Sequence, residues 1–347
     1  MFLYLLSPVI AELMLGSSPP LTFALLSWTD IPMYGGAAIL IRELALRWRK
    51  GWPTIIALGV AYAFAEEGII VRTFFDPTAG PLAGLHDYGW LGGANWVWIT
   101  SMAIYHSLVS IALPIMLVKM AFPERANEPW VGRRWLVCSS AAFLAIVAIW
   151  LPLYKAPVDG RLIIASVVAI EVIGVVAYLL PEKVRWPVRR DGTAAEAGAA
   201  GPAAVDHPAP SPRRVVVTVA VSVVAIFFVS ISKLGPPIVP IVSELAIAGA
   251  LLAWIGRNSA KPDWTNRQRF AVAVGVFACM WLFSPVVELG GGFGQLAVTG
   301  AGIWVSRRIW VALRDAEADE SAGAADGAAE PIDGAAEASP GRSASSI

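Results

Sequence analysis

The chain contains ten apolar runs, most of them close to the length of a membrane-spanning helix, and this pattern limits the fold more than any other feature. A spanning helix needs about 20 predominantly apolar residues. The composition agrees, because 57% of the 347 residues are hydrophobic and only 15% are charged. We therefore predict an all-α fold, a polytopic helical bundle in a lipid bilayer. The runs begin with a short segment at the N-terminus and continue at residues 21–46, 53–74, 94–122, 135–154, 162–181, 215–233, 236–256, 270–287 and 290–306.

The positive charges between these runs predict the orientation of the bundle. Lys and Arg follow the second, fourth, sixth, eighth and tenth runs, whereas the loop that holds Asp76 and Asp87 has none after Arg72. Because Lys and Arg concentrate in cytoplasmic loops, both termini are expected on the cytoplasmic side. The polar segments are rich in Ala, Gly, Pro and Arg, which is typical of a GC-rich bacterial genome. We therefore expect the bacterial inner membrane as the location.

Two polar segments divide the chain into four parts. Residues 182–214 and 315–347 are rich in small residues and Pro, can bury little apolar surface, and are predicted to be disordered. The first segment separates a six-helix part, residues 1–181, from a four-helix part, residues 215–314. The acidic tail is interpreted as a solvated segment.

Charge and cysteine content exclude several classes of protein. The formal net charge is zero, so no basic surface for nucleic acid is expected, and the lipid bilayer is the predicted partner. Cys138 and Cys279 lie far apart and have no metal-binding spacing. His106 is the only histidine in an apolar run, and no His-Glu-x-x-His motif occurs. Neither a cofactor nor a metal is predicted.

Adjacent carboxylates occur at Glu66 and Glu67, inside the apolar run 53–74. At the centre of a membrane helix, an ionisable side chain costs about 2.5–3.5 kcal/mol, whereas each Leu, Ile or Val returns about 0.3–0.6 kcal/mol. Two neighbouring carboxylates also repel, which favours a shared proton and leaves one group as an acid and the other as a base. The pair predicts a functional site. The alternative is a protonated Glu that only bonds to a backbone carbonyl.

Depth along the helices indicates which groups can meet this pair. At about 1.5 Å per residue, Glu66 and Glu67 lie roughly 12–15 Å below the outer boundary and His106 lies roughly 17–20 Å below it. The helices of these residues are antiparallel neighbours in sequence, so they are expected to pack together. Glu171 and Glu244 fall at a similar depth. Each of these groups alone is also compatible with a satisfied interhelical hydrogen bond.

Glu66-Glu67 followed by Arg72, with His106 on the next helix, resembles the first two motifs of the CPBP superfamily, the glutamic intramembrane proteases that include CAAX prenyl endopeptidases. That family has Glu-Glu-x-x-x-Arg and Phe-x-x-x-His, whereas here four residues precede Arg72 and Met102 occupies the Phe position. The family's second intramembrane His has no counterpart. The resemblance covers residues 53–122. It implies that Glu66 or Glu67 activates a water, that His106 holds or protonates the intermediate, and that Asn95 or Ser110 adds a polar contact.

Two other classes of function stay open. A proton- or ion-coupled transporter would use acids at one depth on several helices, here Glu66, Glu67, Glu171 and Glu244, beside helices broken by Pro and Gly. A non-catalytic membrane scaffold would keep the same groups only for stability. In a transporter, Glu171 and Glu244 should line the same cavity as Glu66. In a protease they can be peripheral.

Overall fold

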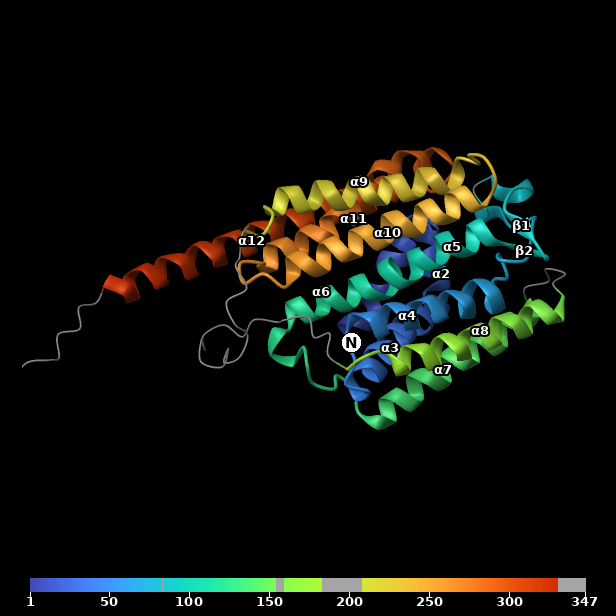
Figure 1. Ribbon diagram of the computed structural model, residues 1–347, viewed down its shortest axis with the longest axis horizontal. Coiled ribbons are helices and arrows are strands. Elements are labelled where there is room, and N and C mark those ends of the chain that lie inside the picture. Colours follow the sequence, from blue (N-terminus) through green and yellow to red (C-terminus); the bar gives the residue numbers. More distant parts are fainter. Residues whose placement is uncertain (83, 154–158, 183–207, 330–347) are drawn as a thin grey trace, which may run out of the picture.

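The computed structural model describes residues 1–82, 84–153, 159–182 and 208–329, and in this part the chain is a bundle of helices with one small hairpin (Figure 1). The hairpin pairs Trp90–Leu91 (β1) with Ala94–Asn95 (β2). The α-helices of the N-terminal half are α1 (Phe2–Pro8), α2 (Pro20–Asp30), α3 (Gly36–Arg47), α4 (Trp52–Ala63), α5 (Trp96–Tyr105), α6 (Leu113–Ala121), α7 (Arg133–Leu153) and α8 (Gly160–Leu179). Those of the C-terminal half are α9 (Pro212–Ile231), α10 (Ile238–Ser259), α11 (Asn266–Leu289) and α12 (Gln295–Ala329).

Four π-helical segments extend or join helices of the N-terminal half. They are η1 (Val9–Met14), η2 (Ile31–Gly35), η3 (Phe64–Ile70) and η6 (His106–Ala112). The structure also has three short 3₁₀ turns, η4 (Gly80–Leu82), η5 (Leu85–Asp87) and η7 (Pro123–Arg125). In a π-helical segment the backbone N–H bonds to the carbonyl five residues earlier, as Val71 N does to Glu66 O at 2.8 Å. We call these four segments the wide turns.

Eight helices in the described residues are long and apolar enough to cross a membrane. The expected segment at the N-terminus, Phe2–Met14, is shorter than a span. α12 begins at Gln295, and Arg307 and Arg308 interrupt its apolar sequence. The helical membrane fold is therefore confirmed, while the total of ten spans and the orientation of the termini stay predictions. The eight are Pro20–Arg47, Trp52–Ile70, Trp96–Ala121, Arg133–Leu153, Gly160–Leu179, Pro212–Ile231, Ile238–Ser259 and Asn266–Leu289.

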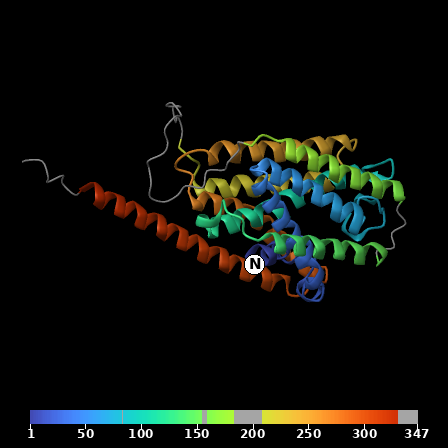
Figure 2. The same ribbon diagram turned by 90° about the horizontal axis from the view of Figure 1, so that it is seen from below.

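The helix α5–α6 lies between the two halves of the bundle. On one side it packs on α4, and α3, α7 and α8 lie beyond (Figure 1). On the other side it contacts α9, α10 and α11. The far end of α12 projects beyond the bundle, as Figures 1 and 2 show. The residues of α5–α6 are thus in a position to contact groups from both halves.

The polar segments differ in part from the expected boundaries. α9 begins at Pro212, and Ala209 N just before it bonds to Asp263 Oδ2 at 2.7 Å. α12 continues to Ala329, beyond the expected start of the acidic tail at residue 315. There Arg267 Nη1 bonds to Glu317 Oε2 at 2.9 Å, which ties the start of α11 to α12. Residues 183–207 and 330–347, where disorder was predicted, lie outside the described residues.

Pro114 accounts for one long-range contact that fixes the N-terminal segment. A proline within a helix cannot donate to the carbonyl four residues earlier, which here is that of Ser110. Ser7 Oγ donates to this carbonyl at 2.6 Å, and both residues are buried. This bond seats α1 against η6.

Glycines allow two close approaches between helices of the N-terminal half. A Cβ added to Gly35 would lie 2.1 Å from Tyr4 O, and one added to Gly59 would lie 2.6 Å from Ser107 Cα. Small residues at such contacts let membrane helices pack closely. The contact at Gly59 brings α4 against η6, which holds His106.

Candidate functional site

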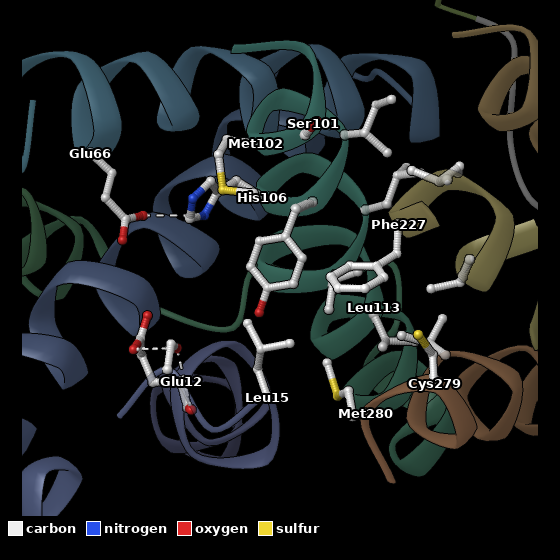
Figure 3. Close-up of a pocket in the computed structure, with 18 of the residues that line it drawn as sticks. Glu12, Leu15, Glu66, Ser101, Met102, His106, Leu113, Phe227, Cys279 and Met280 are labelled. Atoms are coloured by element: carbon white, nitrogen blue, oxygen red, sulfur yellow. Dashed lines mark hydrogen bonds and ion pairs between the residues drawn. The ribbon is translucent and has the colours of Figure 1, made fainter. Parts of the chain in front are cut away.

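His106 lies between Glu66 and Glu67, and all three side chains are buried. His106 Nδ1 is 3.2 Å from Glu66 Oε2, and His106 Nε2 is 3.1 Å from Glu67 Oε1. Figure 3 shows the pairing of Glu66 with His106, and Met102 beside the imidazole ring. The predicted proximity of the two glutamates to His106 is confirmed. A doubly protonated imidazole can donate to both carboxylates, whereas a neutral ring has one donor and one acceptor.

The wide turn η3 explains how two adjacent glutamates reach the same imidazole. In an α-helix, successive side chains are about 100° apart, because a turn holds 3.6 residues. A π-helical turn holds more residues, so adjacent side chains diverge less. Glu66 and Glu67 both lie in η3, and His106 is the first residue of η6.

Thr73 and Trp98 fix the orientation of Glu67. Thr73 Oγ1 donates to Glu67 Oε2, and Trp98 Nε1 donates to Thr73 Oγ1 at 2.9 Å. Glu67 Oε1 already pairs with His106, so both of its oxygens are engaged. Glu66 differs, because its Oε2 is buried and has no hydrogen-bond partner among the described residues, apart from its ion-pair distance to His106.

Tyr34 connects Glu66 to a third carboxyl group, Glu12. The Tyr34 hydroxyl contacts both Glu12 Oε1 and Glu66 Oε1. A phenol hydroxyl carries one proton and can donate to only one of these oxygens. The other contact then requires a proton on the carboxyl group. At least one of Glu12 and Glu66 is therefore protonated when this arrangement forms.

A mostly apolar cavity of about 880 Å³ lies against these groups and between the two halves of the bundle. Glu12, Glu66 and His106 line one side of it, and Leu113, Phe227, Cys279 and Met280 line the other (Figure 3). On α11 the lining extends from Val272 to Val287, roughly 22 Å at about 1.5 Å per residue. The volume falls within the usual 300–1,000 Å³ of ligand pockets. The cavity offers a long apolar chamber with one polar wall.

The auxiliary residues expected from the sequence separate into two groups. Ser110 lies at the site, with its Oγ 3.3 Å from His106 Nδ1. Asn95 instead caps α5, accepting from Trp98 N and donating to the carbonyls of Leu85 and Tyr88, so its observed role is structural. Arg72 donates to Leu151 O at 2.6 Å, at the end of α7.

The two acids proposed for a transport path do not join the cluster around His106. Glu171 is exposed on the surface of α8. Glu244 is fully buried on α10, where its Oε2 accepts from Ser101 Oγ at 2.9 Å, and Ser101 Oγ is 2.7 Å from Ser230 Oγ. Ser101 and Ser230 line the cavity, whereas neither Glu171 nor Glu244 is among its lining residues.

Glu12 and Tyr34 belong to the site, although no pattern in the sequence assigned them a role. Glu12 lies in a segment too short to count depth reliably from a membrane boundary, and a tyrosine in an apolar run carries no signal of its own. A backbone signal was present, since Pro32 and Gly35 flank Tyr34. These residue types favour an irregular helix.

The Glu66, Glu67 and His106 atoms that could bind a metal lie within 4.8 Å of one another. Catalytic zinc uses three protein ligands. Here, however, the two carboxylates face different nitrogens of one ring. A metal bound to one nitrogen would have only one of the two carboxylates on its side of the imidazole. The arrangement fits proton transfer better than metal coordination.

Comparison with known protein families identifies a family to which most of the chain matches. The model of a family described as an uncharacterized membrane protein family matches residues 1–306. No curated protein and no solved structure matches the chain.

Proposed function

The chain belongs to an uncharacterized membrane protein family. From this premise we propose that it is a glutamic intramembrane hydrolase, in which Glu66, Glu67 and His106 catalyse the cleavage of amide bonds in a substrate. The observation that carries the proposal is the pair of carboxylates on the two nitrogens of one buried imidazole, at 3.1 and 3.2 Å. General acid–base catalysis requires this kind of contact between positioned groups. The adjoining cavity provides space for an apolar substrate.

The hydrogen bonds divide the roles between the two glutamates. Glu66 Oε2 accepts no hydrogen bond from the described residues and lies 3.2 Å from His106 Nδ1, so it can take a proton from a water molecule beside it and pass that proton to the imidazole. Glu67, with both oxygens engaged, holds the His106 ring and stabilises its positive charge. Ser110 Oγ near Nδ1 supplies a further polar contact.

The proposed reaction needs only water and the substrate. Glu66 takes one proton from water, and the resulting hydroxide attacks the amide carbon to form a tetrahedral intermediate. The carbon–nitrogen bond then breaks, and the leaving nitrogen takes a proton from the His106 imidazolium. The proton that Glu66 took from water then passes to His106, so that Glu66 is again a carboxylate and His106 again an imidazolium.

The wide turn η3 supports the resemblance to the glutamic intramembrane proteases. Their first motif has three residues between Glu-Glu and Arg, whereas Gly68–Val71 makes four here. A wide turn holds one residue more than an α-helical turn. η3 covers most of these positions, so the additional residue is accommodated in the helix itself. The missing second histidine leaves the acid role to His106 alone.

The experiment compares peptide termini in membranes that contain wild-type protein or the Glu66→Gln variant. Mass spectrometry of new N-termini detects cleavage of any protein in the membrane, so no single substrate has to be chosen. We expect a set of termini present only with wild type, and a rate lower by about 10²–10⁴ in the variant, which is the usual contribution of a positioned base. Glu171→Gln, on the exposed face of α8, is the matched control and should cleave normally. Identical termini with wild type and Glu66→Gln would contradict the proposal.

A further inference from the structure

A continuous series of polar contacts extends from the surface of the molecule to the buried imidazole. Ser17 Oγ and Ser18 Oγ donate to Glu12 Oε2 at 2.7 and 2.8 Å, and Ser17 is exposed. Glu12 Oε1 contacts the Tyr34 hydroxyl, which contacts Glu66 Oε1. The other oxygen of Glu66 lies 3.2 Å from His106 Nδ1. Each member touches the next through an atom that can accept or donate a proton.

We propose that Glu12 and Tyr34 form a proton relay that connects the turn at Ser17 and Ser18 with His106. Glu12 is the outer group of the relay, and Tyr34 passes protons between Glu12 and Glu66. The relay supplies the site with protons through the protein, although the cavity beside His106 is mostly apolar. This inference gives the proposed hydrolase a route for proton exchange, but the contacts that carry it are independent of any substrate.

The transfer balances without a charged tyrosine. In the inward direction, Glu66 begins protonated on Oε2 and gives that proton to His106 Nδ1. At the same time, Glu66 Oε1 takes the hydroxyl proton of Tyr34, and the Tyr34 oxygen takes the carboxyl proton of Glu12. One proton has then moved in effect from Glu12 to His106. Glu12 ends as a carboxylate that the hydroxyls of Ser17 and Ser18 stabilise.

Neighbouring tyrosines show why Tyr34 in particular can relay. Tyr105 donates its hydroxyl to Ala11 O at 2.6 Å, a carbonyl that cannot pass a proton onward. The Tyr62 hydroxyl is buried and has no hydrogen-bond partner among the described residues. Both rings lie close to His106, with centroid distances of 5.3 Å for Tyr105 and 5.7 Å for Tyr62. Proximity to the imidazole is thus shared by three tyrosines, whereas the bridge between two carboxyl groups belongs to Tyr34.

Other titratable groups face the same region and define the controls. Asp30 on α2 lines the cavity, and its Oδ2 has no hydrogen-bond partner within the described part of the chain. Glu67 faces His106 from the opposite side. Neither contacts Tyr34 through a hydrogen bond in the structure as described. Asp30→Asn therefore tests whether an acid that lies near the relay, but has no hydrogen bond to Tyr34, also affects proton exchange at His106.

The experiment measures how fast the His106 ring exchanges its N–H protons with solvent. Protein labelled with ¹⁵N-histidine in lipid nanodiscs gives signals for the three histidines of the chain, and His106→Gln assigns the buried one. We expect Tyr34→Phe to slow this exchange by about a hundredfold, the lower end of what a positioned proton donor or acceptor contributes. Glu12→Gln should slow it similarly. Tyr62→Phe, which also removes one buried hydroxyl near His106, should leave the rate unchanged, as should Asp30→Asn.

Backbone amide exchange in α4 and α5 shows whether a variant has altered local opening of the helices. If the Tyr34→Phe variant does not fold, the Glu12→Gln variant tests the relay by itself. We expect Glu12→Gln to fold, because its amide oxygen can still accept hydrogen bonds from Ser17 and Ser18. Wild-type rates of His106 exchange in Glu12→Gln and in any folded Tyr34→Phe would overturn the relay. Since no substrate is present, failure of the relay leaves the cleavage experiment with Glu66→Gln unaffected, and the reverse also holds.

Discussion

The two halves of the molecule use their helices differently. In the N-terminal half, four wide turns interrupt α-helical geometry, and Glu12, Tyr34, the glutamate pair and His106 all lie in them. In the C-terminal half, the helices of residues 208–329 are regular α-helices, and among the side chains described there, those of residues 208–319, Glu244 is the only buried carboxylate. π-helical segments are frequent at functional sites. The difference indicates that irregular helices position the polar groups, while the regular helices provide the apolar wall of the cavity.

Substitution of His106 should give the largest difference in stability between a variant in the N-terminal half and one in the C-terminal half. We expect His106→Ala to lower the free energy of unfolding by about 3–5 kcal/mol, because it leaves buried carboxylates without their partner. Glu244→Ala removes one hydrogen bond from Ser101 and should cost only about 1 kcal/mol. Thermal unfolding of both variants in the same detergent measures the difference. Equal losses would mean that the cluster at His106 is no more critical for stability than the isolated acid.

Added methyl groups should distinguish close from loose helix packing. Gly35→Ala places a Cβ 2.1 Å from Tyr4 O and should destabilise the protein by about 1–3 kcal/mol, as overpacking does. Gly249 on α10 has no atom within 4 Å of its added Cβ, so Gly249→Ala is the matched control and should be tolerated. A Gly35→Ala variant with wild-type thermal stability would show that the wide turn η2 moves away from α1 without loss.

The ion pair between Lys233 and Asp87, which lies outside the membrane, should have the smallest effect on stability. Lys233 Nζ lies 2.5 Å from Asp87 Oδ1 and connects the loop before α5 to the segment after α9. The hydrogen bond from Lys233 holds the pKa of Asp87 below its ordinary value. A carboxyl with a lowered pKa stabilises the fold above its unfolded pKa, and this contribution is lost as the pH falls through the folded value.

Asp87→Asn should therefore lower the melting temperature slightly at neutral pH, and the difference from wild type should vanish in acid. Melting curves at several pH values measure this, with Lys233→Gln as the reciprocal variant. A pH-independent difference would indicate that the pair acts through packing and not through charge.

The sequence predicted the helical membrane fold and the meeting of Glu66, Glu67 and His106, because length, hydropathy and depth are local properties. It did not predict that Glu171 would be exposed. α8 is apolar on every side, so its periodicity does not indicate which face contacts other helices. Asn95 was also hard to place, since an asparagine at the boundary of a predicted helix can cap that helix or serve a site equally well.

The wide turns were not predictable for another reason. They depend on which carbonyl each backbone N–H selects, and that selection involves distant partners such as Ser7 at the carbonyl of Ser110. Glu12 and Tyr34 are brought to Glu66 by this tertiary arrangement. Their spacing along the chain therefore gives no signal of the contact.

The wide turns also have an evolutionary consequence. Since a wide turn holds one residue more than the α-helical turn it replaces, deletion of a single codon within η1, η2, η3 or η6 would favour a return to α-helical geometry there. Loss of one codon from η3 would restore the regular helix and rotate Glu66 relative to all that follows, while every residue type of the site stayed in the gene. A one-residue gap at η3 in a related sequence would thus indicate that this arrangement of side chains has been lost there. Such gaps can identify the site where residue identities alone cannot.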